Sequence, residues 1–86
     1  MENPNFYEAE RFLILGLYPQ AFEAYMALEV GSKERNYLMP CQMALKNQLT
    51  TSQLDLLFHE LDLEVKNSNA RATYNYGLVM EHTGNQ

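Results

Sequence analysis

The segment Gly16-Leu17-Tyr18-Pro19-Gln20-Ala21-Phe22-Glu23-Ala24-Tyr25-Met26-Ala27-Leu28 has the pattern of a helix end, a tight turn and a second helix. Gly16 can adopt the positive φ that commonly ends a helix. Pro19 suits the first turn of the next helix because its φ is already fixed and a missing N–H costs nothing there. Ala21 and Tyr25 then lie one turn apart on the same face. The segment therefore predicts a helical hairpin whose two helices approach closely at Ala21.

The composition of the whole chain extends this helical interpretation. The chain has 86 residues, of which 47% are hydrophobic, and it holds only four Gly and three Pro. A chain of this length forms one small domain, and its apolar residues recur at helical rather than at strand spacing. The expected fold is all-α, with about five antiparallel helices in a single domain over residues 1–86.

Capping and turn residues set the expected ends of these helices. Three helices are expected at about residues 4–15, 19–30 and 33–48. A fourth is expected to follow the cap residues at 50–53 and to close at 66–69, and a fifth is expected to end at Gly84. Asn3 is the expected N-cap of the first helix, and the glycines at 16, 31 and 84 are expected at helix ends. Thr50 and Gln53 have the spacing of a capping box, and the last helix is expected to begin after Ser68 or Asn69.

The third segment contains a conflict between helix signals. Ser32 offers an N-cap, but Pro40 lies inside a helix over residues 33–48. A proline in a helix interior removes one hydrogen bond and clashes with a carbonyl, at a cost of about 3 kcal/mol. The sequence favours a helix that is kinked or broken at Pro40. The alternative is a short turn over 32–39, followed by a helix that begins at Pro40.

Charge and hydropathy restrict the expected partners and location. The net charge is −5 at pH 7, whereas proteins that bind nucleic acid or anionic lipid need a basic surface. Neither nucleic acid nor a membrane is therefore an expected partner. No apolar stretch approaches 18 residues, the N-terminal residues do not resemble a signal peptide, and the single cysteine, Cys41, fits a reducing compartment. The expected location is the cytoplasm.

Motifs for chemistry are weak in this sequence. His59-Glu60-Leu61-Asp62-Leu63 begins like the zinc-binding HExxH helix, but Leu63 occupies the place of the second histidine. Cys41 has no basic neighbour in sequence that would lower its pKa, so it is expected to be a buried structural thiol. Because no phosphate-binding loop and no catalytic Ser/His/Asp pattern is present either, we expect no enzyme activity, no metal and no cofactor.

The spacing of the hairpin residues resembles the tetratricopeptide repeat. The matching positions are Ala9, Phe12, Gly16, Tyr18, Ala21, Tyr25 and Leu28. That family repeats every ~34 residues, and the turn positions Gly16, Thr50 and Gly84 recur at this interval. Residues 70–84 also resemble the first helix of a Sel1-like repeat. The resemblance divides the chain into a repeat at about 3–31, a degenerate repeat at about 32–67 and a half repeat at 69–86.

The resemblance implies a function in protein–protein interaction. In the family, the first helix of each pair lines a groove that holds a helix or peptide of a partner protein. The positions that would face this groove here are Phe6, Glu10, Leu13, Tyr37, Asn47, Arg71, Tyr74, Leu78 and Glu81. The implied function is that of a small cytoplasmic adaptor or chaperone, one version of which is a secretion-type chaperone. The alternatives are a self-assembling homodimer or higher oligomer and, less favoured by the acidic charge, a helical transcriptional regulator.

Overall fold

The computed structural model describes residues 4–33 and 35–83, and this part of the chain is all-helical, as the sequence predicts. Its helices are α1 (Pro4–Ile14), α2 (Tyr18–Val30), α3 (Leu38–Leu45), α4 (Thr51–Lys66) and α5 (Ala70–Thr83). The expected caps Asn3 and Gly84 lie outside the described residues.

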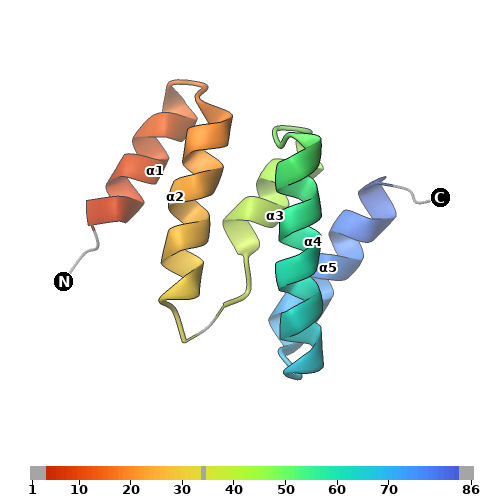
Figure 1. The fold of residues 1–86 in the computed structure, drawn as a ribbon. Coiled ribbons are helices and arrows are strands. Elements are labelled where there is room, and N and C mark those ends of the chain that lie inside the picture. Colours follow the sequence, from red (N-terminus) through yellow and green to blue (C-terminus); the bar gives the residue numbers. More distant parts are fainter. Residues whose placement is uncertain (1–3, 34, 84–86) are drawn as a thin grey trace.

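The helices form two parts that meet at α2 and α3. α1 and α2 pack along each other as a hairpin, and α2 also packs against α3. α5 packs against both α3 and α4, so the last three helices form a second unit. Figure 1 shows α1 and α5 at opposite sides of the molecule, with the other helices between them.

The core draws apolar side chains from every helix. Its buried members are Ala9, Ala21, Phe22, Tyr25, Met26, Tyr37, Cys41, Met43, Ala44, Leu57, Leu61, Ala72 and Val79. Ala9 and Ala21 are fully buried, and such small side chains let α1 and α2 approach closely. On α4, Leu57 and Leu61 are fully buried, and Leu54 and Phe58 pack partly buried against the core, so this helix buries one apolar face.

The turn between α1 and α2 has the backbone that the sequence predicts. Gly16 has φ +78°, Gly16 N donates to Leu13 O at 3.1 Å, and Leu17 N donates to Phe12 O at 2.8 Å. This pair of hydrogen bonds around a left-handed residue is the Schellman motif, which satisfies carbonyls at a helix end. Gly31 differs, because it follows α2 with φ −88°. Gly31 therefore ends α2 as expected, but in a backbone conformation that is open to any residue.

The favoured kinked helix over 33–48 is also wrong. α3 has only eight residues and begins at Leu38, so Pro40 is its third residue. In the first turn of a helix the N–H groups have no helical acceptor, and a proline there removes no hydrogen bond. The N-cap position belongs to Tyr37 rather than to Ser32. The open alternative, a turn followed by a helix that begins near Pro40, describes the chain better.

The starts of α4 and α5 follow the predicted capping pattern. Gln53 N donates to Thr50 Oγ1 at 3.1 Å, and Thr50 N donates to Gln53 Oε1 at 3.3 Å, so the capping box is complete. At α5, Asn69 Oδ1 accepts a hydrogen bond from Ala72 N at 3.1 Å. This is the side-chain bond expected of an N-cap asparagine. Of the two expected positions, Ser68 and Asn69, the structure therefore has α5 begin after Asn69.

Candidate interaction surface

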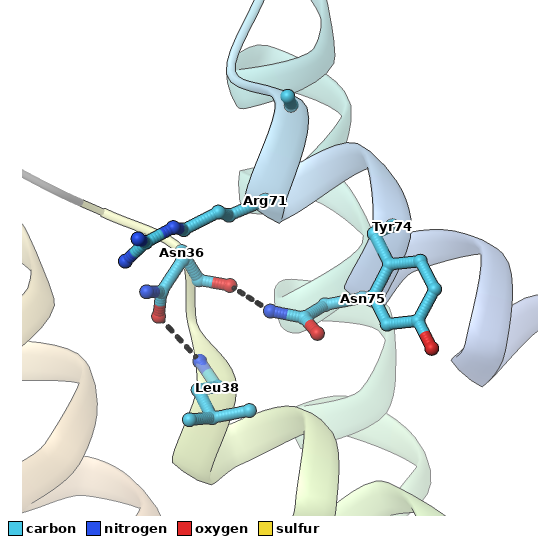
Figure 2. A pocket seen from close by; sticks show the side chains of 6 residues that line it. Asn36, Leu38, Arg71, Tyr74 and Asn75 are labelled. Atoms are coloured by element: carbon cyan, nitrogen blue, oxygen red, sulfur yellow. Dashed lines mark hydrogen bonds between the residues drawn. The ribbon is translucent and has the colours of Figure 1, made fainter.

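A hollow of about 340 Å³ lies where the segment before α3 passes the first turns of α5 (Figure 2). We call it the α5 hollow, and its lining residues are Asn36, Leu38, Ala70, Arg71, Tyr74 and Asn75. Tyr74 is 68% exposed and Leu38 is 45% exposed. The hollow therefore combines two exposed apolar side chains with amide and guanidinium groups, a composition suited to recognition of a peptide.

Two asparagine side chains hold the extended segment that forms one wall of this hollow. Asn69 Nδ2 donates to Arg35 O at 3.0 Å, and Asn75 Nδ2 donates to Asn36 O at 2.9 Å. Asn75 is only 7% exposed, so its amide requires such a partner. Asn36 Oδ1 also accepts from Leu38 N at 2.9 Å (Figure 2). Side chains of the α5 region thus fix the wall by bonding its backbone carbonyls.

Tyr37 fixes the other side of the same segment, inside the core. Its backbone has the left-handed values φ 56° and ψ 34°, which cost a non-glycine residue about 1 kcal/mol or more. Tyr37 N donates to Glu29 Oε2 at 3.0 Å, and its hydroxyl donates to Glu60 Oε1 at 2.9 Å. The side chain is fully buried. The expectation that Tyr37 faces a partner is corrected, because the turn before α3 directs it into the core.

Burial changes the acidity of the groups around Tyr37. It raises the pKa of the Glu29 carboxyl above its ordinary value; the Tyr37 N–H opposes this rise and the Glu64 charge adds to it. Burial, together with the nearby Glu60 carboxylate, also raises the pKa of the Tyr37 hydroxyl. The pKa of the Cys41 thiol rises to about 12, mainly through burial and further through Glu29. Cys41 is therefore protonated at neutral pH, in line with the structural thiol that the sequence predicts.

Glu64 is the buried acid at the junction of α4 and α5. It is 7% exposed. Its Oε1 accepts from Asn69 Nδ2 at 3.1 Å, and its Oε2 lies 4.0 Å from Arg35 Nε. A buried carboxylate needs such partners because desolvation penalises its charge. Glu64 therefore serves to position Arg35 and Asn69 beside the α5 hollow.

The predicted groove residues of α5 lie on or near the hollow. Arg71 and Tyr74 line it. Leu78 and Glu81 are exposed further along α5, one and two turns beyond Tyr74. Asn47 lies in the turn after α3, where its Oδ1 is 3.2 Å from His82 Nε2. Four of the predicted positions thus share one helix, and two of these contribute to the hollow.

The predicted groove residues of α1 lie elsewhere. Phe6 is 45% exposed, whereas Leu13 is partly buried against the core. Glu10 accepts a hydrogen bond from the Tyr25 hydroxyl, and burial together with this bond raises the pKa of Tyr25. Because α1 and α5 lie at opposite sides of the molecule (Figure 1), the nine predicted residues do not form one surface.

Sequence reasoning missed four residues of the hollow: Asn36, Leu38, Ala70 and Asn75. The first two were assigned to a helix over 33–48, in which they would have been ordinary helical residues. Asn75 is an asparagine inside a helix, where that residue type is unfavourable. Such a residue in a helix interior was the one signal in the sequence that marked a buried polar contact.

A second hollow adjoins the first at the end of the molecule where α5 begins. It has about 390 Å³ and is lined by Lys33, Asn36, Ser68, Asn69, Ala70 and Arg71. Three of these residues also line the α5 hollow. The two hollows are therefore adjacent, and together we call them the α5 trough.

Comparison with known proteins does not identify a family for this chain. The sequence matches no family model, and no curated protein or solved structure is significantly similar to it. Within residues 4–33 and 35–83, no helix is long and apolar enough to cross a membrane. The same residues contain no group of three or more His, Cys, Asp or Glu side chains that could hold a metal ion. The tetratricopeptide resemblance stays a prediction.

Proposed function

We propose that this chain is a protein-interaction module, an adaptor or chaperone of the cytoplasm, that binds a helix or extended peptide of a partner protein. The observation that carries the proposal is Tyr74, which is 68% exposed at the edge of a hollow of about 340 Å³. Tyrosine supplies a large, rigid contact area, and it is enriched among the residues that dominate binding energy in interfaces.

The spacing of the helices supports the repeat-like arrangement behind this proposal. α1, α3 and α5 begin 34 and 32 residues apart, and α2 and α4 begin 33 residues apart. Gln53 Nε2 donates to Pro19 O, and Asn69 Nδ2 donates to Arg35 O, and each bond joins residues 34 positions apart. Repeat proteins place equivalent positions of successive units side by side. The proposed binding helix, α5, would be the first helix of a third unit.

Selection of peptides tests this function directly. The chain is immobilised and exposed to a phage library of random heptapeptides, and the affinities of the enriched peptides are measured by fluorescence polarisation. Tyr74→Ala is expected to weaken their binding about tenfold or more, as for a residue that anchors an interface. Tyr7→Ala is the matched control, because Tyr7 is a 53% exposed tyrosine on α1 that lines no part of the α5 trough.

Two outcomes would overturn the proposed function. One is a library from which the folded chain enriches no peptide. The other is a set of peptides whose affinity is unchanged in Tyr74→Ala, since the contact surface would then lie elsewhere. Circular dichroism of both variants shows whether each keeps its helices, so a loss of binding is read only from a folded protein.

Self-assembly is the second candidate, and the tip of the α1–α2 hairpin favours it. Ile14 is 81% exposed, Leu15 is 63% exposed and Leu17 is 40% exposed. Contiguous exposed aliphatic side chains commonly mark contact surfaces. If the chain assembles through this tip, light scattering gives the mass of an oligomer for the wild type and that of a monomer for Leu15→Glu. A monomeric wild type at the highest soluble concentration would remove this candidate.

A further inference from the structure

Gly77 lies in the middle of α5 on the exposed side of that helix. A Cβ atom added there would meet no atom of the described residues within 4 Å. The position does not require positive φ either, so any residue could occupy it. A glycine in a helix interior is destabilising relative to alanine, but its bare backbone allows another chain to approach closely. Gly77 therefore weakens its own helix and offers a site of close approach to a second molecule.

Two complementary side chains flank Gly77 on the same exposed face of α5. Tyr74 lies one turn before it and Glu81 lies one turn after it, and both are exposed. In the part of the chain that the structure describes, neither side chain forms a hydrogen bond or an ion pair. Seven residues span ~10 Å along a helix axis. The Tyr74 hydroxyl therefore does not reach the Glu81 carboxylate of its own helix.

Bonds between a tyrosine and a glutamate join other elements of this molecule. The Tyr25 hydroxyl of α2 donates to the Glu10 carboxylate of α1, and the Tyr37 hydroxyl donates to the Glu60 carboxylate of α4. In the α1–α2 hairpin this bond accompanies close approach of the helices at two fully buried alanines. The chain thus closes its hairpin with small residues and a tyrosine–glutamate bond, and α5 carries both features on its exposed face.

We infer that the exposed face of α5 binds α5 of a second copy of this chain, with the two helices antiparallel and in closest contact at Gly77. An antiparallel pair centred on residues 77 and 78 places each Tyr74 opposite Glu81 of the other copy. Leu78, which is 36% exposed, then lies against the Gly77 backbone of the other copy. A two-fold axis repeats every contact, so the face is complementary to itself. The carboxylate acceptor strengthens both hydroxyl bonds.

The inferred dimer goes beyond the proposed function and competes with it for one side chain. Tyr74 also lines the α5 hollow, so a dimer covers the residue that would anchor a partner peptide. A contact of one helix per copy is small among protein interfaces, and we expect a dissociation constant of about 10–100 μM. Such a dimer shields Tyr74 when the chain is concentrated and gives way to a peptide that binds more tightly.

Sedimentation equilibrium over a range of protein concentrations measures this dimer, and Gly77→Gln is the variant that tests it. Glutamine is a better helix former than glycine and has open space at this position, so the fold of dilute protein is expected to be as stable as the wild type or more so. The dissociation constant of the dimer is expected to rise about tenfold or more, because the new side chains hold the two helices apart. Leu15→Glu, at the exposed tip of the α1–α2 hairpin, is the control and is expected to dimerise like the wild type.

A double-mutant cycle tests the bond between Tyr74 and Glu81. Tyr74→Phe removes the hydroxyl and keeps the ring, and Glu81→Ala removes the carboxylate. Each substitution removes the same two symmetric bonds, so each is expected to raise the dissociation constant of the dimer about tenfold. The double variant is expected to lose no more than either single variant. A double variant whose loss equals the product of the single losses would show that the two groups do not bond, and would overturn the inference.

Three further results would overturn the inferred dimer: a wild type that is monomeric at its highest soluble concentration, a dimer that Gly77→Gln leaves intact, and a dimer that Leu15→Glu abolishes. None of them affects the proposed peptide binding, because Gly77 lines neither hollow of the α5 trough. Conversely, a dimer that Gly77→Gln disrupts, in a chain that enriches no peptide, overturns the proposed function and supports this inference.

Discussion

The two parts of the molecule are held together by different kinds of contact. The α1–α2 hairpin depends on a tight turn at Gly16 and on close packing at Ala9 and Ala21. The α3–α5 unit also has an apolar core, but it adds polar bonds to an extended segment, which Asn69 and Asn75 hold by its carbonyls. The turn of the first part is specified by residues near one another in sequence, whereas the bonds of Asn69 and Asn75 join residues more than thirty positions apart.

This difference shows where the molecule can acquire a binding surface. A hairpin of amphipathic helices satisfies its backbone within its own helices and leaves few polar groups at its contact. An extended segment has no such internal bonds, so neighbouring side chains must supply them. Around residues 35–38 this requirement gathers amide and charged groups beside apolar ones, and the α5 trough lies at that place.

The largest expected effect on stability is the difference between two tyrosines of the second part, Tyr37 in the core and Tyr74 at the surface. Tyr37→Ala removes a fully buried aromatic ring and its bond to Glu60, and we expect a loss of about 3–5 kcal/mol in the free energy of unfolding. Tyr74→Ala, at a side chain that is 68% exposed, is expected to cost less than about 1 kcal/mol. Urea titration followed by circular dichroism measures both. Similar losses would contradict the assignment of Tyr37 to the core and Tyr74 to the surface.

The next effect concerns the polar bonds of the second part alone. Asn75→Ala leaves the Asn36 carbonyl without its donor, and we expect a loss of about 1–3 kcal/mol. Asn67→Ala, at an exposed asparagine after α4, is the control and is expected to be nearly neutral. Hydrogen exchange of α3 amides is expected to rise in Asn75→Ala and not in the control. Unchanged exchange would mean that apolar packing, rather than this bond, positions α3.

Substitutions at two glycines compare the turn of the α1–α2 hairpin with the interior of α5. Gly16 has φ +78°, so Gly16→Val is expected to cost about 1–2 kcal/mol through backbone strain alone, because open space surrounds its Cβ position. Gly77 lies within α5 with open space around it, and Gly77→Ala is expected to stabilise by about 0.5–1 kcal/mol. Thermal unfolding of the two variants and the wild type measures both the expected loss and the expected gain of stability. A neutral Gly16→Val would show that this turn does not need its left-handed residue.

The sequence predicted the first part of the molecule better than the second for a physical reason. Periodicity, Gly16 and Pro19 act over a few residues, and so does the capping box of Thr50 and Gln53, so each can be read locally. The left-handed backbone of Tyr37 goes with hydrogen bonds to Glu29 and Glu60, which lie eight and 23 positions away in the sequence. No local pattern predicts such a turn, so helical periodicity alone predicts a helix that continues through it.

The candidate site was predicted in part for the same reason. Arg71 and Tyr74 lie on a helix whose register is evident from the sequence, and both line the α5 hollow. Asn36 and Leu38 depend on the path of an irregular segment, which periodicity does not describe. The predicted positions on α1 do not share a surface with those on α5. The tetratricopeptide pattern from which they were predicted assumes full-length repeats, whereas α3 here has only eight residues.

The smallest expected effect lies where the two parts meet, at Glu29. Burial raises the pKa of this carboxyl above its ordinary value of 4.5, so the folded protein binds its proton more tightly than the unfolded chain does. The stability from this group is complete at low pH and is lost as the pH rises through the raised value. Glu29→Gln keeps an oxygen that can accept from Tyr37 N and removes the charge. It is therefore expected to stabilise the protein at pH 7, by at most about 0.5 kcal/mol because solvent screens a half-buried group.

Denaturant titrations of Glu29→Gln and the wild type at several pH values check both the sign and the window. The two proteins are expected to be equally stable below about pH 4 and to diverge above it, with the wild type the less stable. Glu23→Gln, at an exposed position of α2, is the control and is expected to follow the wild type. A wild type that gains stability over Glu29→Gln as the pH rises would show that the bond from Tyr37 N outweighs burial. The contact between the two parts would then require the charged carboxylate.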